Sequence, residues 1–186
     1  MTVADLDIVN PYFRTKDGAE ILSAHGIRLI SSEYANSNVD LPALPGEAYA
    51  LVDDRSVHGV IDVGGDDRGA LALGRWRDAI LAENNYEMLL VVNCYRPLTR
   101  DVPSTLEVMA EIETAARMRV TGVVNNSNLG EETTPGTVLS SMEYARGVCE
   151  ETGLPRKMTT VKADLLPALE GRIDNLFPLN LQEKIK

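Results

Sequence analysis

The sequence has 186 residues, of which 44% are hydrophobic and 25% are charged, and this composition is ordinary for one soluble globular domain. Its net charge is -10, and no run of Lys or Arg exceeds two residues, which argues against an extended nucleic-acid interface. No apolar run approaches the roughly 18 residues that span a bilayer, so no membrane anchor is expected. The first residues lack the regions of a signal peptide, and Cys94 and Cys149 fit no metal-ligand spacing, so the cytoplasm is the expected location.

Short runs of β-branched residues alternate with amphipathic stretches along the chain, which is typical of a parallel sheet covered by helices. The predicted fold class is therefore α/β, a three-layer sandwich around a mostly parallel sheet. The predicted strands are residues 2–6, 27–31, 57–63, 88–93, 120–125 and 158–161. The predicted helices are residues 16–24, 46–51, 68–84, 103–117, 135–151 and 165–172. One domain is expected over residues 1–172, followed by a tail, 173–186, that either docks on the surface or stays free.

Two local features bear on these elements. Pro103 and Pro135 lie where two predicted helices begin, and the first helical turn tolerates proline. The run of residues 88–92 has no polar alternation, as expected for a strand that is buried on both faces.

The most informative stretch is Asp62-Val63-Gly64-Gly65, which follows a β-branched apolar run and precedes a predicted helix. An acidic residue at the end of a buried strand, followed by two glycines, presents a carboxylate to a magnesium–phosphate group and lets backbone N–H groups approach the phosphate. A helix cap and a tight turn are the alternative interpretations. Asp5 and Asp7 lie on one face of the first predicted strand, because the side-chain period is two, and two like charges favour a cation between them.

Amide side chains follow two other predicted strands. Asn93 ends one of them, and Asn125 with Asn126 ends the next. An amide presents a donor and an acceptor together and so suits the edge of a nucleotide base. Asn also suits turns, and a turn role for at least one of these residues is the alternative. All of these positions lie at carboxyl ends of predicted strands, where open α/β sheets bind ligands.

Four segments, taken in chain order, resemble the ParA/MinD/CobQ-like P-loop ATPases, whose relatives include the nitrogenase iron protein and the arsenite-pump ATPase. The likeness runs from residue 2 to about residue 165 and points to the small bacterial members described only as nucleotide-binding. The segments are Asp5-Leu6-Asp7-Ile8-Val9-Asn10-Pro11-Tyr12-Phe13-Arg14, Asp62-Val63-Gly64-Gly65-Asp66, Val92-Asn93-Cys94-Tyr95-Arg96-Pro97 and Gly122-Val123-Val124-Asn125-Asn126-Ser127-Asn128.

The resemblance implies ATP and Mg²⁺ as cofactors and a role for each matching acidic position. Asp7 matches the carboxylate that positions the attacking water, and Asp5 matches the acid beside the magnesium shell. Asp62 matches the acid that holds magnesium through water, and Gly65 matches the glycine that bonds the γ-phosphate. The reaction in the family is attack of water on that phosphate, catalysed mostly by positioning and charge neutralisation.

The resemblance also implies how the base is read and what the protein assembles with. Asn126 matches the adenine-reading amide, with Asn125 as the second candidate. ATP is expected to hold a homodimer together, and a further protein partner is expected to respond to that state.

The sequence departs from the family in one large respect, because it contains no G-x-x-x-x-G-K-[ST] motif. In the family, the phosphate-binding strand, the P-loop and its lysine precede the Asp-x-Asp strand, so we predict no measurable ATP hydrolysis by this chain. That strand normally lies near the middle of the sheet, and its removal is expected to leave neighbouring strands unpaired. A late gene start, a shortened chain and a genuine remnant used for binding are the three explanations, and the first two are favoured.

Two other functions stay open on the sequence alone. One is an ATP-dependent ligase related to the enzymes of cobyrinate amidation and dethiobiotin synthesis, which use the same fold to phosphorylate a substrate carboxylate. The other is a non-catalytic interaction module that ignores nucleotide. In that case the apolar segment Leu176-Phe177-Pro178-Leu179 is either a docking element or packed on its own domain.

Overall fold

The computed structural model describes residues 1–6, 15–31, 50–54 and 56–181, and it has the α/β class that the sequence predicts. The chain divides into two compact units, Met1–Tyr86 with Ile112–Met118 and Glu87–Glu111 with Arg119–Lys186. Each unit contains its own sheet, and every strand pair in both sheets is parallel. The predicted single sheet is therefore two sheets, because no hydrogen-bonded pair among the described strands joins β3 to β4.

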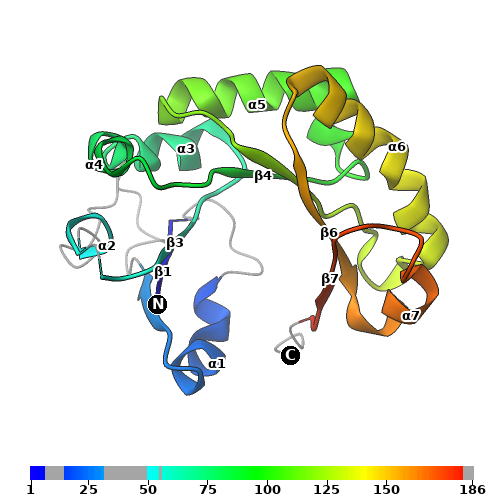
Figure 1. Cartoon of the computed structure of the whole chain (residues 1–186), viewed down its shortest axis with the longest axis horizontal. Coiled ribbons are helices and arrows are strands. Elements are labelled where there is room, and N and C mark those ends of the chain that lie inside the picture. Colours follow the sequence, from blue (N-terminus) through cyan, green and yellow to red (C-terminus); the bar gives the residue numbers. More distant parts are fainter. Residues whose placement is uncertain (7–14, 32–49, 55, 182–186) are drawn as a thin grey trace. The chain divides into compact units, whose positions relative to one another are not determined.

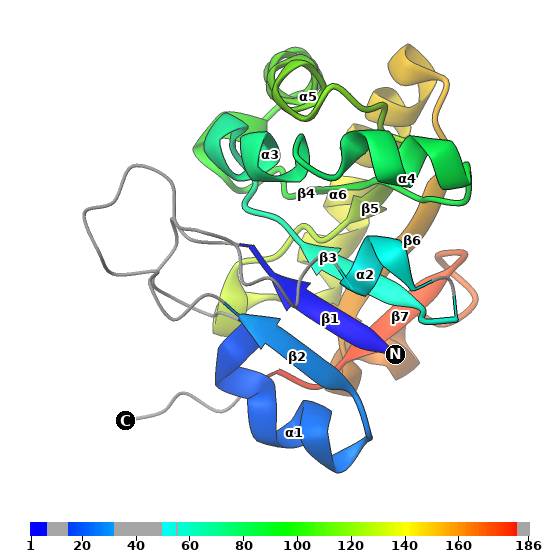
Figure 2. The same ribbon diagram turned by 90° about the vertical axis from the view of Figure 1, so that its left-hand side faces the viewer.

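The sheet of the first unit has the order β2-β1-β3 (Figure 2). Its strands lie within the predicted ranges and are β1 (Thr2–Asp5), β2 (Arg28–Ser31) and β3 (Gly59–Asp62). The central strand, β1, is buried along its whole length, as its two neighbours require. A 3-10 turn, Thr15–Gly18, leads into helix α1 (Ala19–Ala24), which packs beside β2.

The predicted helix over residues 68–84 is two helices, α3 (Asp67–Leu73) and α4 (Arg77–Glu83). The chain turns at Gly74, where an added Cβ would lie 3.2 Å from the Leu71 carbonyl oxygen. The turn carries Trp76 into the interior, where it is 1% exposed. Helical periodicity continues through a single glycine, so the sequence pattern did not show the break. A short helix, α2 (Ala50–Asp53), overlaps the end of the predicted helix at 46–51, and residues 46–49 lie outside the described part.

The sheet of the second unit has the order β4-β5-β6-β7, of which Figure 1 labels β4, β6 and β7. Its strands are β4 (Leu89–Val92), β5 (Gly122–Asn125), β6 (Arg156–Lys162) and β7 (Leu176–Leu179). The two long helices match their predictions and are α5 (Val102–Ala116) and α6 (Pro135–Thr152). Helix α6 packs on β5 and β6. It begins with a capping box between Thr134 and Thr137, and Pro135 occupies the first turn, where proline costs no backbone bond.

The core of the second unit lies under α6 and around a short helix, α7 (Leu166–Leu169), which follows a 3-10 turn, Ala163–Leu165. Its fully or nearly fully buried side chains are Val138, Val161, Leu169 and Ile173. Two further 3-10 turns, Pro97–Thr99 and Gly130–Glu132, follow β4 and β5. Among the described residues, none of the helices combines the length and apolarity needed to cross a membrane.

The expectation that residues 88–92 are buried on both faces is wrong, because only one face of β4 is covered. Leu90 and Val92 are buried, whereas Leu89 and Val91 are 37% and 57% exposed. An uninterrupted apolar run does not reveal whether the second face of a strand is covered.

The predicted tail contains β7, which pairs in parallel with β6 in the register Thr159 to Leu176. Leu176 packs against the core, whereas Phe177 is 49% exposed. Residues 176–179 are therefore packed on their own domain and are not a free tail. Pro178 is compatible with the strand because β7 is an edge strand, where a missing N–H costs little.

Candidate functional site

Two carboxylates stand side by side at the carboxyl end of the first sheet. Asp5 ends β1 and Asp62 ends β3, and the two residues are register partners on adjacent parallel strands. Register partners on neighbouring strands project on the same face, and the strands themselves are about 4.8 Å apart. Asp5 is 6% exposed. The Thr15 hydroxyl donates to Oδ2 of Asp62 at 2.5 Å, which fixes the orientation of that carboxylate.

The loop after Asp62 folds directly onto α3. A Cβ at Gly69 would lie 2.7 Å from the Gly64 carbonyl oxygen and 2.8 Å from its backbone nitrogen, so only glycine allows this approach. Asp66 adds a second link, because its Oδ1 accepts from the Gly69 backbone N–H at 2.8 Å and caps the helix. The loop between β3 and α3 is therefore held to the helix at two positions, Gly64 and Asp66.

Gly65 differs from its neighbour, because nothing in the described structure requires a glycine there. Among the described residues, a Cβ at Gly65 would meet no atom within 4 Å, and the φ of Gly65 is not positive. A glycine without a local steric reason is what close approach of a ligand to the backbone would call for.

Asp7, the predicted water-positioning carboxylate, lies outside the described residues. Among the residues that are described, no group of three or more His, Cys, Asp or Glu side chains is arranged to hold a metal ion. Asp5 and Asp62 alone fit the pattern of Mg²⁺ sites that use one or two carboxylates, with water and substrate phosphates as the other ligands.

In the second unit, the amide of Asn125 is used inside the protein. The residue is 0% exposed. Its Nδ2 donates to the Ser141 hydroxyl at 2.9 Å, and its Oδ1 accepts from the Ser127 backbone N–H at 3.2 Å. Both ends of the amide are thus occupied, and the bonds tie the end of β5 to α6.

The neighbouring amide, Asn126, is half-buried and only partly used. Its Oδ1 accepts from the Thr160 hydroxyl on β6 at 2.5 Å. Its backbone N–H donates to the Val92 carbonyl at 2.8 Å, which places the residue at the end of β4 as well. Within the described part of the chain, Nδ2 of Asn126 has no acceptor. The bond from Thr160 therefore orients an amide whose donor is available to a ligand.

The side chain of Asn93 bonds to the loop that follows β4 and to the loop that follows β5. Its Oδ1 accepts from the Tyr95 backbone N–H at 2.9 Å and from the Asn128 backbone N–H at 3.3 Å. Its Nδ2 donates to the Asn128 carbonyl at 3.3 Å. The Tyr95 hydroxyl in turn donates to the Thr137 carbonyl at 2.8 Å, and partial burial raises the pKa of this phenol. Asn93 thus acts as the turn residue that the sequence left open as an alternative.

The structure brings some of the predicted residues together. Asp5 is paired with Asp62, and Gly64 and Gly65 follow in the same loop. In the second unit, Asn93 and Asn126 lie on adjacent loops, which are linked through Asn128.

Three residues with clear roles were not singled out from the sequence. Gly69 sits inside a predicted helix, and an isolated glycine in a helical pattern is a signal of close backbone approach that could have found it. Thr15 and Thr160 orient Asp62 and Asn126, but the separations of 47 and 34 residues leave no local sequence signal.

Comparison with known proteins gives no relative. No family model, no curated protein and no solved structure matches the chain.

Proposed function

We propose that this protein is an ATP-binding switch protein of the ParA/MinD kind and that the carboxyl end of its β2-β1-β3 sheet binds the magnesium–phosphate part of the nucleotide. The observation that carries the proposal is the register pairing of Asp5 with Asp62, followed by the Gly64-Gly65 loop. Two adjacent carboxylates repel each other, and a divalent cation placed between them removes that repulsion. Mg²⁺ keeps several water ligands, so two carboxylates are enough to hold it.

The form of the loop supports the phosphate end of this proposal. Gly69 and Asp66 hold the loop against α3, while Gly65 leaves its backbone uncovered. The backbone N–H groups of such a loop can donate to an anion. Because the loop is already fixed, it loses little conformational entropy when the anion binds. Residues 7–14, which include Asp7, complete the expected acidic set but lie outside the described part.

The affinity of this site for nucleotide is expected to be low. The sequence has no P-loop lysine, so we expect binding in the millimolar range and no ATP hydrolysis.

The experiment is a thermal melt with and without millimolar Mg·ATP. A ligand that binds only the native state raises the midpoint, so the wild-type midpoint should rise, and EDTA should cancel the rise. Asp62→Asn should abolish the shift. Glu83→Gln, which removes one charge from an exposed residue of α4, should leave it unchanged. No shift for wild type, or the same shift for Asp62→Asn, would refute the proposal.

The amide of Asn126 is tested separately within the second unit. Adenosine alone should perturb the NMR signals of the Asn126 side chain and its neighbours in wild type. Asn126→Ala should weaken that titration, whereas Asn93→Ala should alter the fold of the loop instead, because three of its bonds are internal. Equal adenosine binding by wild type and Asn126→Ala would remove Asn126 from the proposed base-reading role.

A second function, a non-catalytic interaction module, is favoured by one observation. Strand β7 is an edge of its sheet and carries Phe177 at 49% exposure. An edge strand with an exposed aromatic residue offers backbone bonds and one anchoring side chain to a partner segment. A chain that melts cooperatively, shows no response to Mg·ATP and binds a partner through Phe177 would favour this second function over the first.

A further inference from the structure

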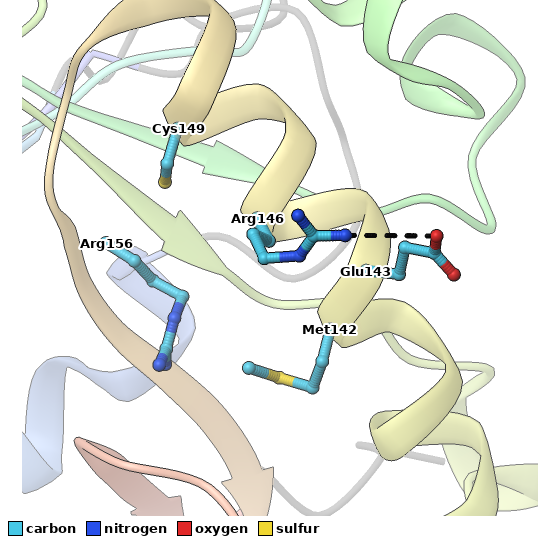
Figure 3. Close-up of a pocket in the computed structure, with 5 residues that line it drawn as sticks. All are labelled: Met142, Glu143, Arg146, Cys149 and Arg156. Atoms are coloured by element: carbon cyan, nitrogen blue, oxygen red, sulfur yellow. Dashed lines mark ion pairs between the residues drawn. The ribbon is translucent and has the colours of Figure 1, made fainter.

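A cavity of about 530 Å³ lies on the surface of the second unit, between α6 and the start of β6 (Figure 3). Four of its lining residues come from α6 and one, Arg156, from β6; they are Met142, Glu143, Arg146, Cys149 and Arg156. Met142, Arg146 and Cys149 are four and then three positions apart, so they share one face of the helix. The volume is in the range of small-molecule sites.

Arg156 is held in place by neutral partners. Its Nη1 donates to the Thr159 hydroxyl at 2.8 Å and to the Asp174 carbonyl at 3.0 Å. Within the described part of the chain, no carboxylate lies within ion-pair distance of its guanidinium. The rest of the guanidinium fork is therefore fixed in position, carries a full positive charge and is available for an oxyanion.

The second arginine of the cavity is already paired. Arg146 Nη1 lies 2.7 Å from Glu150 and its Nη2 lies 3.9 Å from Glu143. Figure 3 shows its guanidinium turned toward Glu143. Of the two arginines, Arg156 is therefore the one that can bond an anion, whereas two glutamates already neutralise the charge of Arg146.

The other lining groups are sulfur-containing and neutral. The Met142 sulfur accepts weak bonds from Asn125 at 3.7 Å and from Thr159 at 3.8 Å, and the end of the side chain points toward Arg156 (Figure 3). Burial raises the pKa of the Cys149 thiol, so the thiol is protonated at neutral pH and lines the cavity as a small apolar group. The apolar surface of the two sulfur-containing side chains lies next to a fixed cation. The cavity therefore suits a ligand that has both an apolar group and a negative charge.

We propose that this cavity binds a small oxyanion, a carboxylate or a phosphate, that carries a short apolar group. The oxyanion bonds the free edge of the Arg156 guanidinium, and the apolar group contacts Met142 and Cys149. The net charge of the protein is -10, so long-range attraction does not favour anions, and the selectivity must come from these local contacts. The inference stands independently of the proposed nucleotide function.

The experiment uses Cys149 as a reporter with two alkylating reagents of nearly equal size. In both reactions the thiolate attacks the CH₂ carbon, a C–S bond forms and iodide leaves. Iodoacetate carries the oxyanion and iodoacetamide does not. Because an anion held by a half-exposed cation gains little, we expect the iodoacetate-to-iodoacetamide rate ratio at Cys149 to fall about two- to fivefold in Arg156→Gln.

The controls are internal to the chain. Cys94, which is also half-buried and free, gives a reference ratio in the same sample by mass spectrometry of the two peptides. Arg146→Gln removes the same charge from a residue that Glu143 and Glu150 already neutralise, so it should lower the ratio at Cys149 less than Arg156→Gln does. An equal ratio at both cysteines, or a ratio that ignores Arg156→Gln, would overturn the proposal.

Competition between added anions and iodoacetate on the wild-type protein tests the same proposal, even if Arg156→Gln does not fold. Hexanoate should slow alkylation of Cys149 by iodoacetate about twofold or more, and hexanamide should not. Phenyl phosphate and inorganic phosphate then separate a phosphate ligand from a carboxylate ligand. Equal effects of hexanoate and hexanamide, with no protection by either phosphate, would overturn the assignment of an oxyanion site.

Discussion

The strand ends of the first unit and those of the second carry similar polar residues but use them differently. In the second unit, the amide of Asn125 is buried and bonded at both ends, and Asn93 is bonded within its own loops. In the described part of the first unit, the side chain of Asp62 receives one hydroxyl bond, and no described neighbour gives Gly65 a steric reason to be a glycine. A polar residue at a strand end therefore points to a ligand only when the protein leaves some of its bonding capacity unused.

The largest expected effect tests the internal role of the Asn125 amide. Asn125→Ala leaves the Ser141 hydroxyl and the Ser127 N–H without their buried partner, so it should lower the free energy of unfolding by about 2–3 kcal/mol. Asn126→Ala loses one bond at a half-buried site and should cost less than about 1 kcal/mol. Urea denaturation followed by circular dichroism gives both values. Equal losses of unfolding free energy in the two variants would show that Asn125 and Asn126 contribute equally to the fold.

The next effect tests the same distinction within the first unit. Gly69→Ala puts a methyl group 2.7 Å from the Gly64 carbonyl oxygen and should cost about 1–3 kcal/mol. Gly65→Ala meets no atom of the described residues within 4 Å and should leave stability unchanged, while it weakens binding of Mg·ATP. Fluorescence of Trp76, the sole tryptophan of the chain, reports unfolding of this unit. A destabilised Gly65→Ala would show that Gly65 serves the fold and not a ligand.

The smallest effect concerns a tyrosine that links helix α6 to helix α5. The Tyr144 hydroxyl lies 2.7 Å from the hydroxyl of Thr105, a fully buried residue, and Tyr144→Phe should cost about 1 kcal/mol at neutral pH. Burial raises the pKa of Tyr144 above the usual value near 10. The neutral phenol therefore favours the folded state fully below pH ~10, and this contribution is lost as the pH rises through the raised pKa.

The measurement is the stability of wild type and Tyr144→Phe as a function of pH. The wild-type curve should fall more steeply than that of the variant above pH ~10. Parallel curves would show that Tyr144 ionises as easily in the folded protein as in the unfolded chain.

Much of the fold could be predicted because parallel strands and amphipathic helices leave strong periodic signals. Helix α6 begins at Pro135 as predicted, and β1, β2 and β3 lie within their predicted ranges. The misses have physical reasons. The helix breaks at Gly74 and Trp76 is buried directly after the break, and one face of β4 is left uncovered at Leu89 and Val91. Neither fact is local in sequence.

The candidate site could be predicted only as a set of positions. The sequence showed which residues end strands, and the pairing of Asp5 with Asp62 follows from parallel register. It did not show that Asn125 bonds Ser141 while Asn126 bonds Thr160, because adjacent residues at a strand end point to opposite faces and meet different elements. The cavity at Arg156 was not predicted either, since Arg156 and the α6 face come together only through packing.

The parallel pairing of β7 with β6 also bears on how the protein folds. The two strands must be joined by the crossover of residues 163–175, so β7 reaches its place only after this connection has folded back. Until then, β6 presents a row of unpaired N–H and C=O groups that another chain could pair with. In the folded protein, β7 covers that edge of β6.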